Sequence, residues 1–200
     1  MLSLFKKVMA QVKISDKKVL SNEKYPLHEV SFDIQNKEGE WKEQKYEVYN
    51  HGDAVSALLY NNESRTVILT KQFRIASYLN GNKGGDLIET PAGLLNEGEA
   101  PEAAIIREIK EETGYATAEV TKALEVYSSP GAYTEKLYLF VASYTPQQKV
   151  AKGGGLEEEG EEVTVMEIPF DEALGMIDSG EIKDAKTIML LQYAAMKKLV

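Results

Sequence analysis

Residues 93–115 combine glutamates, one arginine and two glycines at a spacing that could build a metal site. The stretch reads GLLNEGEAPEAAIIREIKEETGY. Proline suits the first turn of a helix, because it has no N–H to lose there and its φ is already helical. Glycine suits the left-handed position that ends a helix. Pro101 and Gly114 therefore predict a short helix between them.

The predicted helix carries a cluster of carboxylates. At about 100° per residue, Glu108, Glu111 and Glu112 fall beside the apolar face that is formed by Ile105, Ile106 and Ile109. Carboxylates this close repel one another unless a cation lies among them. Mg²⁺ and Mn²⁺ prefer such oxygen ligands and also carry substrate phosphates. Arg107 is expected to pair with Glu111, one turn later. A solvated acidic helix without metal is the alternative.

Composition narrows the class of protein. The 200 residues are 43% hydrophobic, which suits one good-sized domain or a domain with a small appendage. The net charge of −9 argues against a nucleic-acid surface. A phosphate-bearing substrate would then need a metal and local basic residues to reverse the field at the site.

Other absences in the sequence set expectations about compartment and chemistry. There is no cysteine, which excludes disulfides, zinc–thiolate sites and cysteine catalysis. No apolar run is long enough to span a membrane. The first ten residues do not read as a signal peptide, so we expect a cytoplasmic protein.

The N-terminal quarter predicts a small antiparallel sheet. Strands are expected at 11–21, 28–35 and 41–50, and Val30, Phe32 and Ile34 alternate with polar residues as in a half-buried strand. A sheet of so few strands has a weak hydrophobic core and is expected to pack against another part of the protein or against a partner. We therefore expect an accessory domain over residues 1–50 and a main domain over residues 51–200.

The main domain mixes strands and helices. Strands are expected at 53–60, 65–73, 86–91, 117–127, 136–144 and 163–170, and helices at 101–114, 170–178 and 185–199, with a hairpin-like connection at 80–85. This mixture favours the α+β class or an α/β/α sandwich. Residues 147–162 are rich in glycine and glutamate. They predict either a solvated acidic run or a mobile lid with a hinge at Gly153–Gly155.

The carboxylate stretch resembles the signature of the Nudix hydrolases, Gly-x5-Glu-x7-Arg-Glu-U-x-Glu-Glu-x-Gly-U, in which U is bulky and apolar. The matching residues are Gly93, Glu99, Arg107, Glu108, Ile109, Glu111, Glu112 and Gly114. Tyr115 departs from the usual aliphatic residue, which affects only local packing. The resemblance implies the Nudix fold, a mixed sheet between helices, over roughly residues 50–200, with the N-terminal strands as an accessory domain.

Further segments narrow the resemblance. Pro130 lies sixteen residues after Gly114, as in the ADP-ribose pyrophosphatase group of this family. The order and spacing of six segments are similar to the GDP-mannose pyrophosphatases within that group. These segments are KQFR at 71–74, NGN at 80–82, AGLL at 92–95, SPGAYTE at 129–135, GGGLEEE at 153–159 and GEIKDAKT at 180–187.

This resemblance implies roles for individual residues. Metal ligands would be the carbonyl of Ala92 with Glu108, Glu112 and Glu159, and the catalytic carboxylates Glu112, Glu159 and Glu111, with Glu159 or Glu112 as the base. Substrate would be bound by Arg74, Ala92, Gly93, Leu94, Glu112, Glu135, Glu158, Glu159 and Lys186. Without the resemblance, Arg74 and Lys186 would read as surface ion pairs.

The resemblance also implies a homodimer with exchanged N-terminal strands. Tyr25, Lys45, Tyr46 and Glu47 would reach into the neighbouring subunit's site. A basic residue is usual where Tyr46 stands, and Glu47 is a candidate acceptor for the donors of guanine. Tyr25 could instead be a packing residue of its strand.

The implied activity is Mg²⁺-dependent hydrolysis, with Mn²⁺ as a possible substitute, of the diphosphate in a nucleotide sugar. GDP-mannose would give GMP and mannose 1-phosphate. ADP-ribose, the second candidate substrate, would give AMP and ribose 5-phosphate. Two interpretations without enzymatic activity are a Nudix-fold sensor and a pure scaffold protein. The intact signature glutamates count against both of these interpretations.

Overall fold

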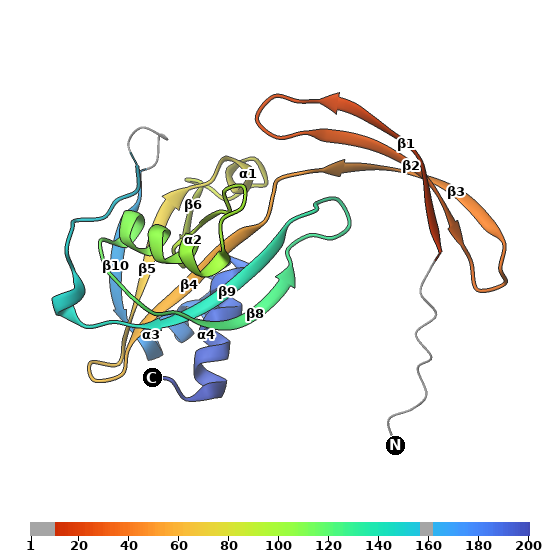
Figure 1. Cartoon of the computed structure of the whole chain (residues 1–200). Coiled ribbons are helices and arrows are strands. Elements are labelled where there is room, and N and C mark those ends of the chain that lie inside the picture. The colour runs from red at the N-terminus through yellow and green to blue at the C-terminus, as the bar shows by residue number, and fades with distance from the viewer. Residues whose placement is uncertain (1–10, 157–161) are drawn as a thin grey trace, which may run out of the picture. The chain divides into compact units, whose positions relative to one another are not determined.

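The computed structural model describes residues 11–156 and 162–200, which form two compact units. The first unit comprises residues up to Gly52 together with Tyr127–Glu135. The second comprises Asp53–Val126 and Lys136–Val200. Figure 1 shows the elements of each unit.

The first unit is built on a three-stranded antiparallel sheet. Its strands β1 (Val12–Ser21), β2 (Leu27–Gln35) and β3 (Trp41–Tyr49) lie in the order β1-β2-β3 (Figure 1). Among the described residues of these strands, Ser31 alone is buried, and apolar side chains such as Ile14 and Tyr46 are exposed. The predicted thin antiparallel sheet is therefore confirmed, and it has almost no core of its own.

A distant segment completes the first unit. The backbone N–H of Tyr49 donates to the carbonyl of Ala132 at 2.8 Å, and that of Thr134 donates to the carbonyl of Tyr49 at 3.2 Å. The Thr134 hydroxyl donates to the Asn50 side chain at 2.9 Å. Residues 132–134 thus form an isolated parallel bridge with Tyr49 at the end of β3.

The second unit is organised around a mixed sheet in the order β10-β5-β4-β9-β8, with β6 paired to β5 and β7 paired to β4. Strand β4 runs antiparallel to β5 and β7 and parallel to β9. The strands are β4 (Ala54–Asn61), β5 (Thr66–Phe73), β6 (Asp86–Glu89), β7 (Ala92–Leu94), β8 (Thr121–Tyr127), β9 (Lys136–Ser143) and β10 (Thr164–Pro169).

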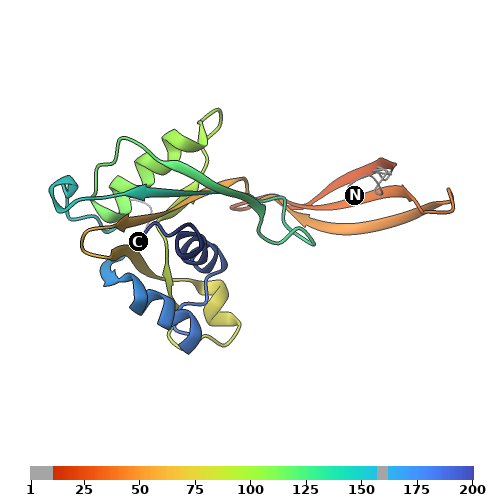
Figure 2. The same ribbon diagram turned by 90° about the horizontal axis from the view of Figure 1, so that it is seen from below.

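Helices cover both faces of this sheet. In β4, Ala54 and Leu58 point to one face, and Val55, Ala57 and Leu59 to the other. The second set packs with helix α2 (Pro101–Glu108), while the first packs with α3 (Phe170–Ser179) and α4 (Ala185–Lys197). Figure 2 shows these helices on opposite sides of the sheet. The predicted sandwich is confirmed.

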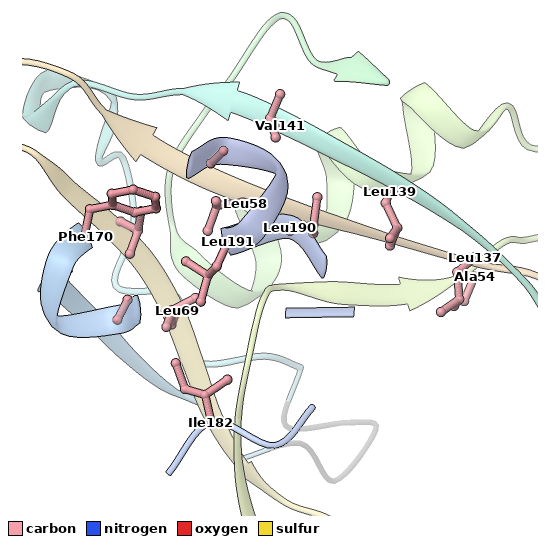
Figure 3. Packing of buried hydrophobic residues seen from close by; sticks show 13 residues of the cluster. Ala54, Leu58, Leu69, Leu137, Leu139, Val141, Phe170, Ile182, Leu190 and Leu191 are labelled. Carbon is pink, nitrogen blue, oxygen red and sulfur yellow. The ribbon is translucent and has the colours of Figure 1, made fainter. Parts of the chain in front are cut away.

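The larger core lies between the sheet and α3 and α4. Leu58, Leu139, Leu190 and Leu191 are fully buried there (Figure 3). Burying each such side chain contributes about 1.5–3 kcal/mol relative to leaving it exposed. These contacts fix α4 against the sheet, and α4 carries Lys186 near its first residue.

Three elements differ from the expectation. The strand expected at 86–91 ends at Glu89 as β6, and a separate strand, β7, begins at Ala92 and pairs with β4. Helix α1 (Ile75–Leu79) precedes residues 80–85 and was not predicted, because it has no buried residue and therefore no apolar period. The signature helix ends as α-helix at Glu108 and continues as the π-helical turn η1 (Ile109–Thr113).

A 3₁₀ turn, η2 (Pro146–Gln148), follows β9. None of the helices in the described parts of the chain is long and apolar enough to cross a membrane.

Candidate active site

Backbone hydrogen bonds join the end of the signature helix to residues 150–154. Gly114 has φ 75°, as predicted for a helix end. A Cβ added at Gly114 would collide with the carbonyl of Ala151, and one added at Gly153 would meet the carbonyl of Glu112 at 2.5 Å. The N–H of Gly154 donates to that Glu112 carbonyl at 2.8 Å. Residues 150–154 are therefore held in place beside the end of the signature helix.

The three signature carboxylates are not equivalent in the structure. Glu112 is only 2% exposed, whereas the Glu111 side chain is 27% exposed. The π turn changes the angular spacing after Ile109, so the regular 100° step does not hold there. Ile105 and Ile109 are fully buried, as expected for the apolar face, but Ile106 is only half-buried.

Arg107 joins three partly buried carboxylates. Its Nη1 lies 2.7 Å from Glu108 Oε1 and 2.9 Å from Glu111 Oε2, and its Nε lies 3.2 Å from Glu99 Oε1. The predicted pairing with Glu111 is confirmed. Burial would lower the pKa of Arg107, but the bonds to these glutamates raise it above its usual value. Arg107 is thus a cation among Glu99, Glu108 and Glu111.

The backbone of β7 lies against Glu108. Strand β7 pairs with β4 through Gly93 and Val55. A Cβ added at Gly93 would collide with the carboxylate of Glu108. Glycine at this position therefore lets that carboxylate approach the Ala92–Leu94 backbone, which brings two of the predicted metal donors, Ala92 and Glu108, into one neighbourhood.

The oxygen donors among the described residues suit a hard metal ion such as Mg²⁺. They do not form a complete metal site by themselves. The carboxylates of Glu108 and Glu112 and the carbonyl of Ala92 offer oxygen alone, which suits Mg²⁺. Within residues 11–156 and 162–200, no three acidic or histidine side chains are grouped so that they could hold a metal by themselves. Glu158 and Glu159, predicted as substrate and metal residues, lie outside the described residues.

A buried carboxylate joins two of the predicted substrate residues. Glu89 Oε2 lies 2.8 Å from Arg74 Nε, and Glu89 Oε1 lies 2.6 Å from Lys186 Nζ. Lys186 also lies 3.0 Å from Asp184 Oδ1. Burial would lower the pKa of Lys186, but the charges of Glu89 and Asp184 raise it overall. The sequence analysis did not identify Glu89 as a site residue. The feature that could have pointed to it is a charged residue directly after the apolar pair in the strand sequence DLIE.

The start of α4 is fixed to the residue after Glu89. Asp184 caps the helix by accepting a hydrogen bond from the N–H of Thr187 at 3.0 Å. The hydroxyl of Thr187 in turn accepts from the N–H of Thr90 at 2.7 Å. Two segments almost a hundred residues apart in the sequence therefore meet at the position of Lys186.

Other predicted substrate residues belong to the first unit. Glu135 lies 3.1 Å from Nδ1 of His51, and the ring of Tyr25 lies 4.4 Å from the His51 ring. His51 thus joins Tyr25 to Glu135, a link that the sequence did not indicate. Rings of Tyr49 and Tyr133 surround the same histidine.

The remaining predicted residues of this unit lie on β3. Lys45 is 3.3 Å from Glu29, and the ring of Tyr46 is 5.8 Å from that of Phe32. Glu47 lies opposite Glu29 in the β2–β3 register. Because side chains alternate along a strand, Tyr46 points to the opposite face from Lys45 and Glu47.

Comparison with known families identifies both parts of the chain. Residues 50–191 match the family described as the NUDIX domain. This chain belongs to the NUDIX family. Residues 11–49 match the domain described as the GDP-mannose pyrophosphatase NudK N-terminal domain. The prediction of a Nudix hydrolase is confirmed.

Relatives of this Nudix hydrolase extend over both units. Proteins named GDP-mannose pyrophosphatase from Shigella dysenteriae serotype 1 (strain Sd197) and Escherichia coli O157:H7 are each 45% identical to it over 190 residues. The alignments cover 95% of this chain and 98% of each relative.

A solved structure supports the Nudix fold. The crystal structure of an ADP compounds hydrolase superposes with a TM-score of 0.71 and covers 93% of each chain. The two sequences are 17% identical, so this likeness shows the fold alone.

Proposed function

We propose that this Nudix hydrolase cleaves the diphosphate of a nucleotide sugar, GDP-mannose above others, to GMP and mannose 1-phosphate. The observation that carries the proposal is the 45% identity to GDP-mannose pyrophosphatases over 95% of the chain. The aligned part of the chain includes residues 11–49, which match the N-terminal domain of such an enzyme.

The proposed metal ligands are the Ala92 carbonyl, Glu108, Glu112 and Glu159, and the proposed ion is Mg²⁺, for which Mn²⁺ substitutes. Bound there, the ion would activate water and neutralise charge on the phosphates. The packing of Glu108 against Gly93 supports this assignment. Arg107 would hold the Glu108 carboxylate in a fixed direction, because its guanidinium donates to that carboxylate.

The remaining proposed roles belong to the chain's own charged groups. Arg74 and Lys186 bind the diphosphate, since both are held beside one carboxylate. Glu111 is paired with Arg107, so we propose that it supports the cluster. Glu112 and Glu159 remain the candidates for the base that takes the proton of the attacking water.

We propose a homodimer in which residues 1–50 act as the accessory domain, residues 51–200 as the hydrolase domain, and Tyr25, Lys45, Tyr46 and Glu47 serve the neighbouring subunit's site. The bare sheet of the first unit supports this assembly, because its apolar side chains are exposed in one chain. Glu135 would contact substrate with Tyr25. The cytoplasm is the proposed compartment.

Substrate choice is tested by steady-state kinetics. The values of kcat/KM for GDP-mannose, GDP-glucose and ADP-ribose are compared at one Mg²⁺ concentration, with the products identified. We expect the guanine nucleotides to be preferred by about tenfold or more, because each buried polar group left unpaired costs about 1–3 kcal/mol. A higher kcat/KM for ADP-ribose would replace the proposal with an enzyme for adenine nucleotides.

A further inference from the structure

Glu89 is an acidic side chain placed between the two cations of the proposed diphosphate site. Its side chain is only 4% exposed, and each of its oxygens contacts a different cation, Arg74 at 2.8 Å and Lys186 at 2.6 Å. Within residues 11–156 and 162–200, no other acidic side chain forms an ion pair with Arg74. One carboxylate therefore contacts both basic side chains, and Lys186 has Asp184 as a second partner at 3.0 Å.

The way in which Arg74 is held leaves its phosphate-binding end available. Glu89 accepts from Nε, which lies at the base of the guanidinium group. The two terminal nitrogens, which can form bidentate bonds with phosphate oxygens, donate no hydrogen bond to the described residues. The Arg74 side chain is 42% exposed, whereas Lys186 is 12% exposed. Arg74 is thus anchored on its inner side and open on its outer side.

The carboxylate itself sits on fixed backbone. Glu89 pairs with Thr70 in the β5–β6 ladder, and the Thr70 hydroxyl donates to the Glu89 carbonyl at 3.2 Å. The following residue, Thr90, is bonded to Thr187 on α4. The backbone from which the Glu89 side chain projects is therefore held on both sides, by β5 and by α4.

We propose that Glu89 is a positioning residue, which presents Arg74 and Lys186 in the arrangement that a diphosphate requires. The proposal rests on the proposed function for the identity of the natural substrate. Its physical content is preorganisation: ligand binding then loses less side-chain freedom when it orders the two long basic side chains. A merely electrostatic role would act in the opposite direction, because a negative charge beside the site repels phosphate.

The sign of the effect in Glu89→Gln separates these two roles. The substitution keeps the shape and removes the charge. We expect the Kd for inorganic pyrophosphate, measured by calorimetry with chelator present, to rise about tenfold, and kcat/KM for GDP-mannose to fall by about tenfold or more. Tighter pyrophosphate binding in this variant would overturn the proposal.

A matched control lies on the same strand. Asp86, three residues earlier on β6, pairs with Lys71 at 2.9 Å in an exposed position. Like Glu89→Gln, Asp86→Asn removes one carboxylate from an ion pair, in this case the pair with Lys71 on β5. We expect its pyrophosphate Kd and kcat/KM to stay within about twofold of the unmodified protein, since exposed pairs contribute little. An equal loss in both variants would contradict a specific role for Glu89.

A double-mutant cycle tests whether Glu89 acts through the two cations. In an Arg74→Ala/Lys186→Ala background, Glu89→Gln should change kcat/KM by less than about threefold, because its partners are gone. An undiminished loss in that background would show a role in folding alone. If Glu89→Gln does not fold, Glu89→Asp retains the charge and shortens the reach, and is expected to give a smaller loss in the same cycle.

The pyrophosphate measurement also keeps the two proposals distinguishable. If the unmodified protein does not hydrolyse GDP-mannose but binds pyrophosphate in a manner that depends on Glu89, the proposed substrate is wrong and the positioning role stands. If GDP-mannose is hydrolysed and Glu89→Gln has no effect on either measurement, the function stands and the positioning role is wrong.

Discussion

Glu112 differs from the other signature glutamates in its surroundings. Glu108 and Glu111 contact the guanidinium of Arg107, whereas Glu112 is almost fully buried at the π turn. Burying an ionised carboxylate is costly, so a protein retains one chiefly where it has work to do. Glu112 is therefore the described carboxylate on which activity is expected to depend most.

Glu112→Gln keeps the shape of the side chain and removes its charge. We expect kcat to fall by about a hundredfold or more, because a principal electrostatic contribution to the reaction would be lost. Glu102→Gln, an exposed change in the first turn of α2, serves as the control and should leave kcat unchanged. Near-normal turnover of Glu112→Gln, or full activity of the unmodified protein in excess chelator, would contradict the proposed role.

The pair of Glu99 and Arg107 predicts how stability depends on pH. The hydrogen bond from Arg107 lowers the pKa of Glu99 below its ordinary value near 4.5. The pair should therefore stabilise the fold above that pH, and the gain should disappear as the pH falls through the lower pKa of the folded state.

Urea unfolding of the unmodified protein and of Glu99→Gln at pH 7 and pH 3 checks this dependence. The variant should be less stable at pH 7, and the difference should shrink at pH 3. An unchanged difference between the two pH values would show that the charge of Glu99 is not the cause.

Sequence reasoning reached the residues that are close in the chain and missed those that are not. The Arg107–Glu111 pair follows from a four-residue spacing on a helix, so it was predictable. Glu89 meets a residue 15 positions earlier and another 97 positions later, and no local pattern encodes such a meeting. Glu135 was predicted, but its pairing with His51, 84 positions away, was missed for the same reason.

At the scale of elements, strand β7 and the signature helix are coupled through one glycine. Strands such as β4 and β9 were predictable from their apolar residues, because their side chains face two cores. The π turn was not predictable in this way, since it changes the helical period over only five residues. Helix α1 was missed because it buries no side chain.

Gly93→Ala tests the coupling between β7 and the helix. The added Cβ would collide with the Glu108 carboxylate, which must then move. We expect kcat/KM to fall by about tenfold or more while the thermal midpoint changes by a few degrees. Gly175→Ala on α3 meets nothing within 4 Å. As the control it should keep activity and gain roughly 0.5–1 kcal/mol of stability, since alanine favours a helix. Unchanged activity in Gly93→Ala would show that Glu108 has room to move.

At the scale of the whole molecule, the first unit is a sheet with exposed apolar side chains. Its three strands were predicted, the second of them from the alternation of Val30, Phe32 and Ile34 with polar residues, and so was the thinness of its core. The contribution of residues 127–135 was not, because it depends on backbone hydrogen bonds to Tyr49 from a distant segment. The family match relates residues 11–49 of this unit to the N-terminal domain of the GDP-mannose pyrophosphatase NudK.

Subunit mixing tests the proposed dimer. A chain with Arg74→Ala and a chain with both Tyr25→Ala and Lys45→Ala should each be weakly active. If each site takes Arg74 from one subunit and Tyr25 and Lys45 from the other, a mixed dimer has one intact site. We therefore expect activity to recover to roughly a quarter of normal after random mixing. A fully active monomer by light scattering at the assay concentration would refute the exchange.

The hydrogen bonds between Tyr49 and residues 132–134 cannot form during synthesis until the ribosome has added those later residues. The ribosome adds roughly 5 to 20 residues per second, so the strands up to Gly52 emerge on the order of ten seconds before Glu135. During that interval the nascent sheet lacks the segment that joins it at Tyr49, and its apolar side chains are open to water and to other nascent chains. On polysomes, two neighbouring nascent chains can meet in this state, which makes translation speed between residues 52 and 135 a quantity that selection can act upon.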